Sequence, residues 1–146
     1  MNIHWYGKGA EALLAGSIVW ASDTIKVALL EATYTPAQNA DEFWSEVSSH
    51  EASGVGYTAG GQTIVNAGIN YDSVGLRVQF VGDDVEWDPV TVTARFAVIY
   101  KDTGVAGTSA LIAYLDAGSN VVVEEALLKV AWSADGVLVA EVAEDV

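Results

Sequence analysis

The stretch Val90–Tyr100, which reads VTVTARFAVIY, decides the fold class of this 146-residue chain. Its side chains alternate between two faces, as those of a β-strand do. The two faces hold Val90, Val92, Ala94, Phe96, Val98 and Tyr100 on one side and Thr91, Thr93, Arg95, Ala97 and Ile99 on the other. Because both faces are largely apolar, we expect a central strand that is buried on both faces or covered by a neighbouring subunit.

Further strands are predicted around this stretch, because short runs rich in valine alternate with turn signals such as Asp102-Thr103-Gly104 and Gly118-Ser119-Asn120. The expected strands cover residues 17–20, 24–30, 62–67, 74–81, 110–115, 121–132 and 137–142. Strands at this spacing indicate a single mainly β domain over residues 1–146, an antiparallel β-sandwich or barrel-like fold.

One or two short helices are expected near the N-terminus. Residues 8–14 are good helix formers, and Gly16 suits the position after a helix end. Asp41 is expected to cap a single helical turn that contains Phe43 and Trp44. The apolar stretch at residues 10–21 is too short to span a bilayer, so we interpret it as part of the domain.

The charge balance excludes two classes of partner. The chain has 20 acidic and six basic residues, for a net charge of −14. Its bases are scattered singly, whereas nucleic acids and anionic membrane surfaces attract a basic face. We therefore expect neither partner. A second hypothesis follows from the same charge: the chain is adapted to strong brine, where salt screens self-repulsion.

The residues that carry catalysis are sparse. The chain has no cysteine, which excludes disulfides and thiol chemistry. His4 and His50 are the only side chains that ordinarily titrate near neutral pH, and no Gly-x-Ser-x-Gly motif accompanies them. We expect both to be ordinary surface or interface residues, and we expect no enzymatic activity and no cofactor.

The densest acidic cluster lies at residues 83–88. On a strand, Asp84, Glu86 and Asp88 would project from one face, with Val85 and Trp87 on the other. Carboxylate oxygens suit Ca²⁺, which makes these three acids weak candidates for metal ligands. The spacing lacks the pattern of a calcium-binding loop, so a solvated or partner-facing patch is favoured and no metal site is expected.

Aromatic residues supply the interface candidates, which are Trp5, Tyr6, Phe43, Trp44 and Tyr57. Aromatic side chains are enriched at binding hot spots. Trp5, Tyr6 and Trp44 lie in segments with weak secondary-structure signals, which is the reason for considering an interface. The alternative is packing in the chain's own core, since aromatic residues bury large areas.

Seven stretches carry a resemblance to a known family. They are WYG at 5–7, SDTIKVALL at 22–30, YTP at 34–36, DEFW at 41–44, GVGYTAGG at 54–61, ARFAVIYKDTG at 94–104 and TSALIAY at 108–114. Across residues 5–138 the chain resembles small virion structural proteins of tailed bacteriophages and related viruses. That family brings no catalytic motif. The chain departs from it in being more acidic, which favours a virus of a salt-loving host.

The resemblance implies a virion structural protein, most specifically a capsid decoration, cement or turret component on the head surface. Its partners would be the major capsid protein or other virion subunits, and it would form a homo-oligomer, a trimer or pentamer, because such assemblies are usually cyclic. Two alternatives stay open. One is a tail component of the tube, baseplate or fibre, and the other is a carbohydrate- or cell-surface-binding module that uses exposed tryptophans.

Overall fold

The computed structural model describes residues 2–142, so Met1 and residues 143–146 of the predicted 1–146 domain lie outside the described part of the chain. The strands are β1 (Asn2–Trp5), β2 (Ile25–Leu30), β3 (Gln62–Thr63), β4 (Gly68–Asp72), β5 (Arg77–Val81), β6 (Val85–Lys101), β7 (Leu111–Val130) and β8 (Leu138–Glu141). The helices are α1 (Gly7–Leu14) and α2 (Trp44–Val47), with single 3-10 turns at Ser48–His50 and Ala106–Thr108.

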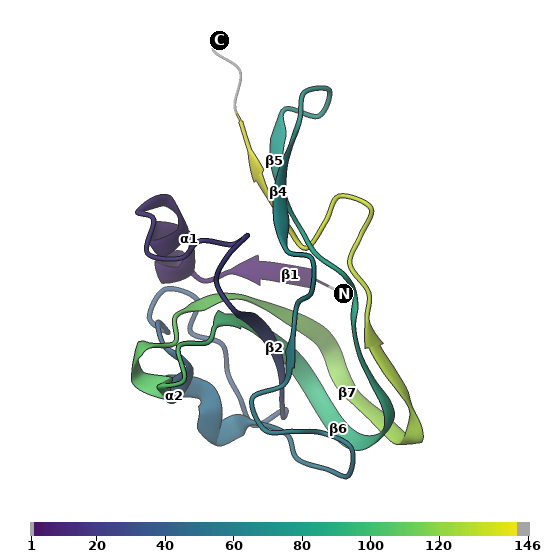
Figure 1. The fold of residues 1–146 in the computed structure, drawn as a ribbon. Coiled ribbons are helices and arrows are strands. Elements are labelled where there is room, and N and C mark those ends of the chain that lie inside the picture. The colour runs from purple at the N-terminus through teal and green to yellow at the C-terminus, as the bar shows by residue number, and fades with distance from the viewer. Residues whose placement is uncertain (1, 143–146) are drawn as a thin grey trace.

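The strands form two antiparallel sheets (Figure 1). The larger sheet has the order β1-β7-β6-β2-β3, and the smaller has the order β4-β5-β8. The predicted mainly β, antiparallel fold with two short helices is confirmed, and the two sheets are compatible with a sandwich. Among the described helices, none has the length and apolar run needed to cross a bilayer.

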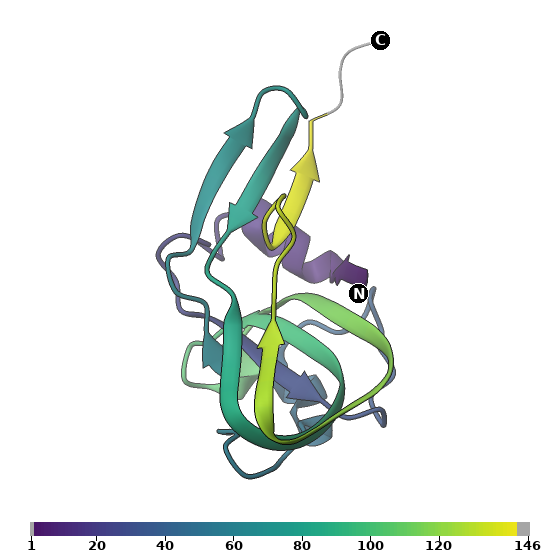
Figure 2. The ribbon, with the colours of Figure 1, turned by 90° about the vertical axis from the view of Figure 1, so that its right-hand side faces the viewer.

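The two sheets share one long ribbon. The ladder of β6 and β7 runs from the pair Tyr100–Leu111 to the pair Val85–Val130, and β5 and β8 resume it at the pair Phe80–Leu138. Figure 2 shows the β6–β7 ribbon curling below, while β4, β5 and β8 project from it. We refer to these three strands as the arm.

The central strand β6 is buried on both faces from Phe96 to Tyr100, as its apolar pattern predicts. The main core contains Val90, Val92, Ala94, Ala97 and Ile99, whereas a second cluster contains Phe96, Val98 and Tyr100. The β6–β7 ladder is irregular between Ala94 and Phe96. Such an irregularity reverses the alternation of side chains. The alternate residues from Val90 to Tyr100 were predicted to share one face. This prediction is therefore wrong beyond Ala94, because Phe96, Val98 and Tyr100 lie on the opposite face.

The second cluster is covered by the segment that follows β2. Tyr34, Trp44 and Val47 from this segment are buried there. The Tyr34 hydroxyl donates to Asp41 Oδ2 at 2.6 Å, and it lies 2.7 Å from the Tyr6 hydroxyl. Burial, reinforced by the bond to Asp41, raises the pKa of Tyr34 far above its ordinary value. The chain itself, rather than another subunit, therefore covers this face of β6.

The predicted cap of α2 is wrong. Glu46, not Asp41, accepts hydrogen bonds from the Glu42 and Phe43 backbone N–H groups, each at 2.6 Å. Asp41 is occupied by Tyr34 and by the Ala37 N–H group. Trp44 begins the helix, and Phe43 precedes it in an extended conformation.

Four other expectations differ from the structure. Residues 17–20 form turns instead of a strand, although Trp20 is fully buried and its Nε1 donates to the Val81 carbonyl at 2.9 Å. The strand expected at 62–67 is only Gln62–Thr63, and the strand expected at 74–81 begins only at Arg77, after a turn. β4 lies between them, in residues for which no element was expected. The turn expected at residues 118–120 lies inside the continuous strand β7, where Gly118 takes a φ of +83°.

Candidate interaction surface

Two of the five aromatic interface candidates are not on the surface. Tyr6 is fully buried, and Trp44 is 8% exposed and stacks on Tyr100 with ring centroids 4.7 Å apart. Both belong to the second cluster on the larger sheet. In this fold both side chains pack in the chain's own core, which is the alternative considered for them, because the chain's own aromatic side chains cover them.

The other three candidates are half-buried. Tyr57 packs against the main core, and its hydroxyl accepts from the Leu29 N–H group and donates to Glu51 Oε1. These bonds fix the loop onto β2 and leave the hydroxyl no further proton to donate. Phe43 lines a polar hollow beside α1. Trp5 packs edge-on against Phe80, with ring centroids 5.6 Å apart, and lines an apolar groove.

The acidic cluster alternates as the sequence predicts. Glu86 and Asp88 are exposed, whereas Val85 and Trp87 between them are buried. Asp84 forms an ion pair with Lys129 at 3.4 Å and accepts from the Trp132 N–H group at 2.9 Å. Within residues 2–142, no three acidic or histidine side chains converge as metal ligands would. Asp84, Glu86 and Asp88 are not brought together around a common centre.

The basic side chains are all engaged with carboxylates. The ion pairs are Lys8–Glu11, Lys26–Asp102, Arg77–Asp72, Arg77–Asp135, Arg95–Asp116, Lys101–Asp23 and Lys129–Asp84. Hydrogen bonds from Arg95 lower the pKa of Asp116 below its usual range. The uncompensated charge of the surface is therefore acidic.

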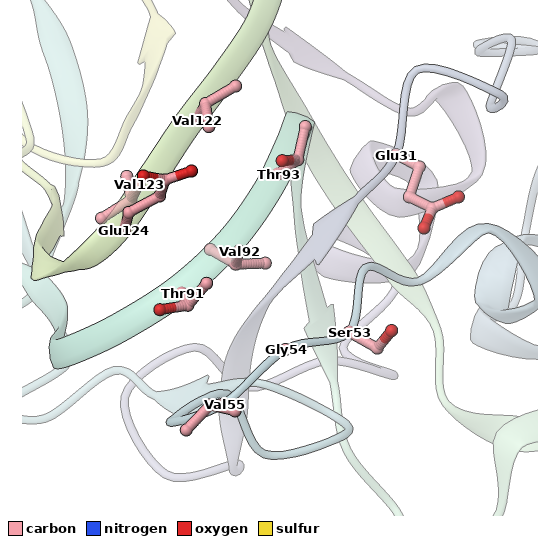
Figure 3. A pocket seen from close by; sticks show the side chains of 10 residues that line it. All are labelled: Glu31, Ser53, Gly54, Val55, Thr91, Val92, Thr93, Val122, Val123 and Glu124. Carbon is pink, nitrogen blue, oxygen red and sulfur yellow. The ribbon is translucent and has the colours of Figure 1, made fainter.

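A polar hollow of about 340 Å³ lies over the middle of the β6–β7 ribbon. Figure 3 shows Thr91 and Thr93 on β6, with Glu124 on β7 on one side and Glu31 across the hollow. Neither histidine lines it. His50 bonds to the Thr33 hydroxyl at 3.0 Å, and His4 stacks on Tyr114 at 5.0 Å. The hollow thus combines hydroxyls and carboxylates with the valine side chains around them.

The arm has one apolar and one polar face. Its register places Ile69 opposite Phe80 and Tyr71 opposite Val78, and Phe80 opposite Leu138. Asn70, Gln79 and Val139 alternate to the other side. An apolar groove of about 380 Å³ lies where the apolar face meets α1, and its lining residues are Trp5, Ala10, Leu13, Leu14, Phe80 and Ala140.

Known protein families, curated proteins and solved structures show no match to this chain.

The apolar face is buried at its root and open at its far end. Phe80 and Leu138 belong to the main core, whereas Ile69 is 50% exposed and Tyr71 is 57% exposed. Leu14 at the rim of the groove and Val74 at the hairpin tip are almost fully exposed. Contiguous exposed apolar residues of this kind mark interaction surfaces. The arm and groove are therefore the candidate interaction surface.

Trp5 is the one residue of this surface among the interface candidates that the sequence predicts. No element was expected at residues 68–73, so the alternation of Ile69 and Tyr71 there went unused. A signal was present, since Gly68–Asp72 alternates apolar and polar residues as a half-exposed strand does. The hairpin turn also has a signal in the sequence, namely Asp72, whose Oδ1 accepts hydrogen bonds from the Val74 and Gly75 N–H groups. Bonds of this kind are typical of aspartate at turns.

Proposed function

We propose that this chain is a virion structural protein of a tailed virus, most specifically a capsid decoration or cement protein on the head surface. One observation carries the proposal: the arm presents an open apolar face beside the apolar groove at α1. Such a surface works by burial against neighbouring subunits. The resemblance of residues 5–138 to phage virion proteins supports the same conclusion and supplies the viral context.

The mechanism is stoichiometric binding. Each square ångström of apolar surface removed from water contributes about 25 cal/mol, so a lattice of repeated contacts stabilises a shell cumulatively. The half-exposed side chains of Ile69 and Tyr71 are suited to this use. The acidic body would meanwhile keep assembled particles apart in solution. The major capsid protein is the proposed lattice partner, and a trimeric or pentameric ring is the proposed arrangement on it.

The experiment is mass spectrometry of purified particles of the encoding virus, separated into heads and tails. Stepwise dissociation at rising denaturant then follows the order in which proteins leave the head. We expect the chain in the head fraction, released before the shell collapses. Its presence in tails alone would refute the decoration role and favour the tail component, and its absence from particles would refute the virion assignment altogether.

The carbohydrate-binding alternative requires exposed tryptophans, and the structure offers few. Trp20, Trp44 and Trp87 are buried, and Trp5 is half-buried at the apolar groove. Trp132 is half-buried, and its Nε1 donates to the Asp83 carbonyl at 2.9 Å. No specific feature of the described surface favours sugar recognition over protein contact.

A further inference from the structure

Among the described strands, β1, β3, β4 and β8 lie at sheet edges, and β4 and part of β7 offer the longest unpaired edges. β1 pairs with β7 only from Ala113 to Asp116, so the rest of the outer edge of β7 has no partner strand within residues 2–142. β4 is the outer strand of the arm, paired with β5 alone. Figure 2 shows no element beside the outer side of β4 at the level of the strand. Unpaired edges of this kind are templates for pairing with another chain.

The β7 edge is charged over only part of its unpaired stretch. Residues 117–123 are uncharged but are interrupted by Gly118, which has a φ of +83°, and exposed Glu124, Glu125 and Lys129 lie beyond them. Charged side chains on an edge strand oppose pairing, because an incoming strand would have to desolvate them. A second copy would also bring its own glutamates against these. The β7 edge is therefore a poor place for two copies to meet.

The β4 edge has the opposite character. Residues 52–82 contain one acid, Asp72, and one base, Arg77, so the segment is neutral in a chain whose net charge is −14. These two residues form an ion pair, with Arg77 Nε 3.2 Å from Asp72 Oδ2, and Arg77 also pairs with Asp135 in the loop before β8. Hydrogen bonds from the Gly75 and Val74 N–H groups, together with Arg77, lower the pKa of Asp72. The turn is thus held in its charged, internally paired form.

We propose that a second copy of this chain pairs with the first along β4, antiparallel, about a two-fold axis at Asn70. The two arms then form one six-stranded sheet in the order β8-β5-β4-β4-β5-β8. The inference deepens the proposed function and rests on it, since it names a second copy as the partner of the arm. This two-fold contact is separate from the trimeric or pentameric ring proposed on the major capsid protein. A two-fold contact uses the same patch on both subunits, which requires a self-complementary edge.

The register about Asn70 is self-complementary. Ile69 of each copy lies opposite Tyr71 of the other, which is the aromatic and β-branched pairing that stabilises antiparallel strands by about 0.2–1 kcal/mol per pair. Asn70 faces Asn70 on the axis, where the two amides can hydrogen-bond. Asp72 faces Gly68, so no two carboxylates are brought together. The apolar faces of both arms become continuous across the new strand pair.

Charge does not oppose a second copy at the β4 edge. Two molecules of charge −14 repel each other except where their contacting surfaces are neutral, and the segment around β4 supplies that neutral surface. A basic partner protein would instead be drawn to the acidic body, away from the arm. The occupant that the arm fits is therefore another copy of itself.

The first test is the mass of the purified full chain by light scattering at about 100 µM, where a contact of micromolar affinity is nearly saturated. We expect a dimer that is stronger at about 0.5 M salt than at about 0.05 M, because screening reduces repulsion between the acidic bodies. Ile69→Lys should weaken dimerisation at least about tenfold, since it places a charge inside the pairing. Val122→Lys, a change at a similarly exposed valine on β7, is the control and should leave the dimer unchanged.

The second test does not depend on destabilising the fold. The chain has no cysteine, so a single Asn70→Cys variant can form a disulfide only between two copies. Cysteines opposed on an antiparallel pair are within the usual Cα separation of a disulfide. We expect rapid oxidation to a covalent dimer, and Ser119→Cys on β7 should remain largely monomeric.

The outcomes separate the two proposals. A monomer at every salt concentration, a dimer that Ile69→Lys leaves intact, or equal cross-linking of the two cysteine variants would overturn pairing along β4. If the chain is a monomer and another virion protein binds its arm, pairing along β4 is overturned but the proposed function stands. A β4-paired dimer that is missing from particles would refute the proposed function and leave the pairing standing.

Discussion

Replacing Gly61 by alanine tests how tightly the loop after Tyr57 is bound to the sheet. Gly61 has a φ of +81°, and a Cβ placed on it would lie 1.8 Å from the Val27 carbonyl oxygen and 2.6 Å from the carbonyl carbon. Both atoms belong to the backbone of β2, which pairs with β6 on one side and β3 on the other. Because neither neighbour can give way, the loop itself has to move.

The matched control is Gly118→Ala. Gly118 has a φ of +83°, but a Cβ there meets nothing within 4 Å. Left-handed backbone costs a non-glycine residue about 1–2 kcal/mol, and we expect that cost for Gly118→Ala. Gly61→Ala adds the loss of the bonds at Gly60, whose N–H group donates to Glu51 and whose carbonyl accepts from Tyr100. At about 1 kcal/mol per bond, the total reaches about 4 kcal/mol.

The assay is urea unfolding followed by tryptophan fluorescence, with the free energy of unfolding taken from the midpoint and slope. Any gain from reducing the entropy of the unfolded chain is common to both variants and cancels in the comparison. We expect Gly61→Ala to be less stable than Gly118→Ala by about 2 kcal/mol or more. Equal stabilities, within about 0.5 kcal/mol, would refute the placement of Gly61 against β2.

Three further predictions concern burial and charge. In the same urea assay, Trp20→Phe should lower the free energy of unfolding by about 1–3 kcal/mol more than Trp87→Phe does. The first substitution removes the hydrogen-bond donor of the Val81 carbonyl, whereas Trp87 Nε1 has no partner within the described residues. The free energy of unfolding should fall above about pH 10, by about 1.4 kcal/mol per pH unit for each tyrosine whose pKa burial raises, because the unfolded chain releases those protons first. Urea midpoints measured from pH 8 to 11 should show this fall. Midpoints that do not change over this range would contradict it. These tyrosines are Tyr6, Tyr34, Tyr57, Tyr100 and Tyr114. The melting temperature should rise from dilute buffer to molar salt if the chain is adapted to brine, and equal melts would remove that hypothesis.

The sequence was informative where one pattern ran unbroken. The strands predicted at 24–30 and 90–100 are found as Ile25–Leu30 and as part of the longer strand Val85–Lys101, and α1 lies within a residue of its expected start and ends at Leu14. Alternation fails at Arg95, because the irregular ladder there depends on the path of β7 around Gly118, which is distant in sequence. A local pattern cannot report which residue a distant strand will place opposite.

The interface candidates show a second limit of sequence reasoning. Large aromatic residues satisfy a core and an interface equally well, and only the fold decides between them. Tyr6 and Trp44 became core residues because the segment after β2 folds back over the larger sheet. The arm was missed because its apolar residues, Ile69 and Tyr71, are few and lie among glycines and asparagines. Such a composition is typical of a loop as well as of a half-exposed strand.

The far end of the arm contributes little to the stability of the monomer. Phe80 and Leu138 at its root belong to the main core, but Ile69, Tyr71 and Val74 beyond them remain at least half exposed. A solvated hairpin needs no apolar side chains at these positions, and their exposure lowers solubility without adding to the core. Their presence in the neutral part of a strongly acidic chain is therefore best explained by a contact that the isolated molecule does not make.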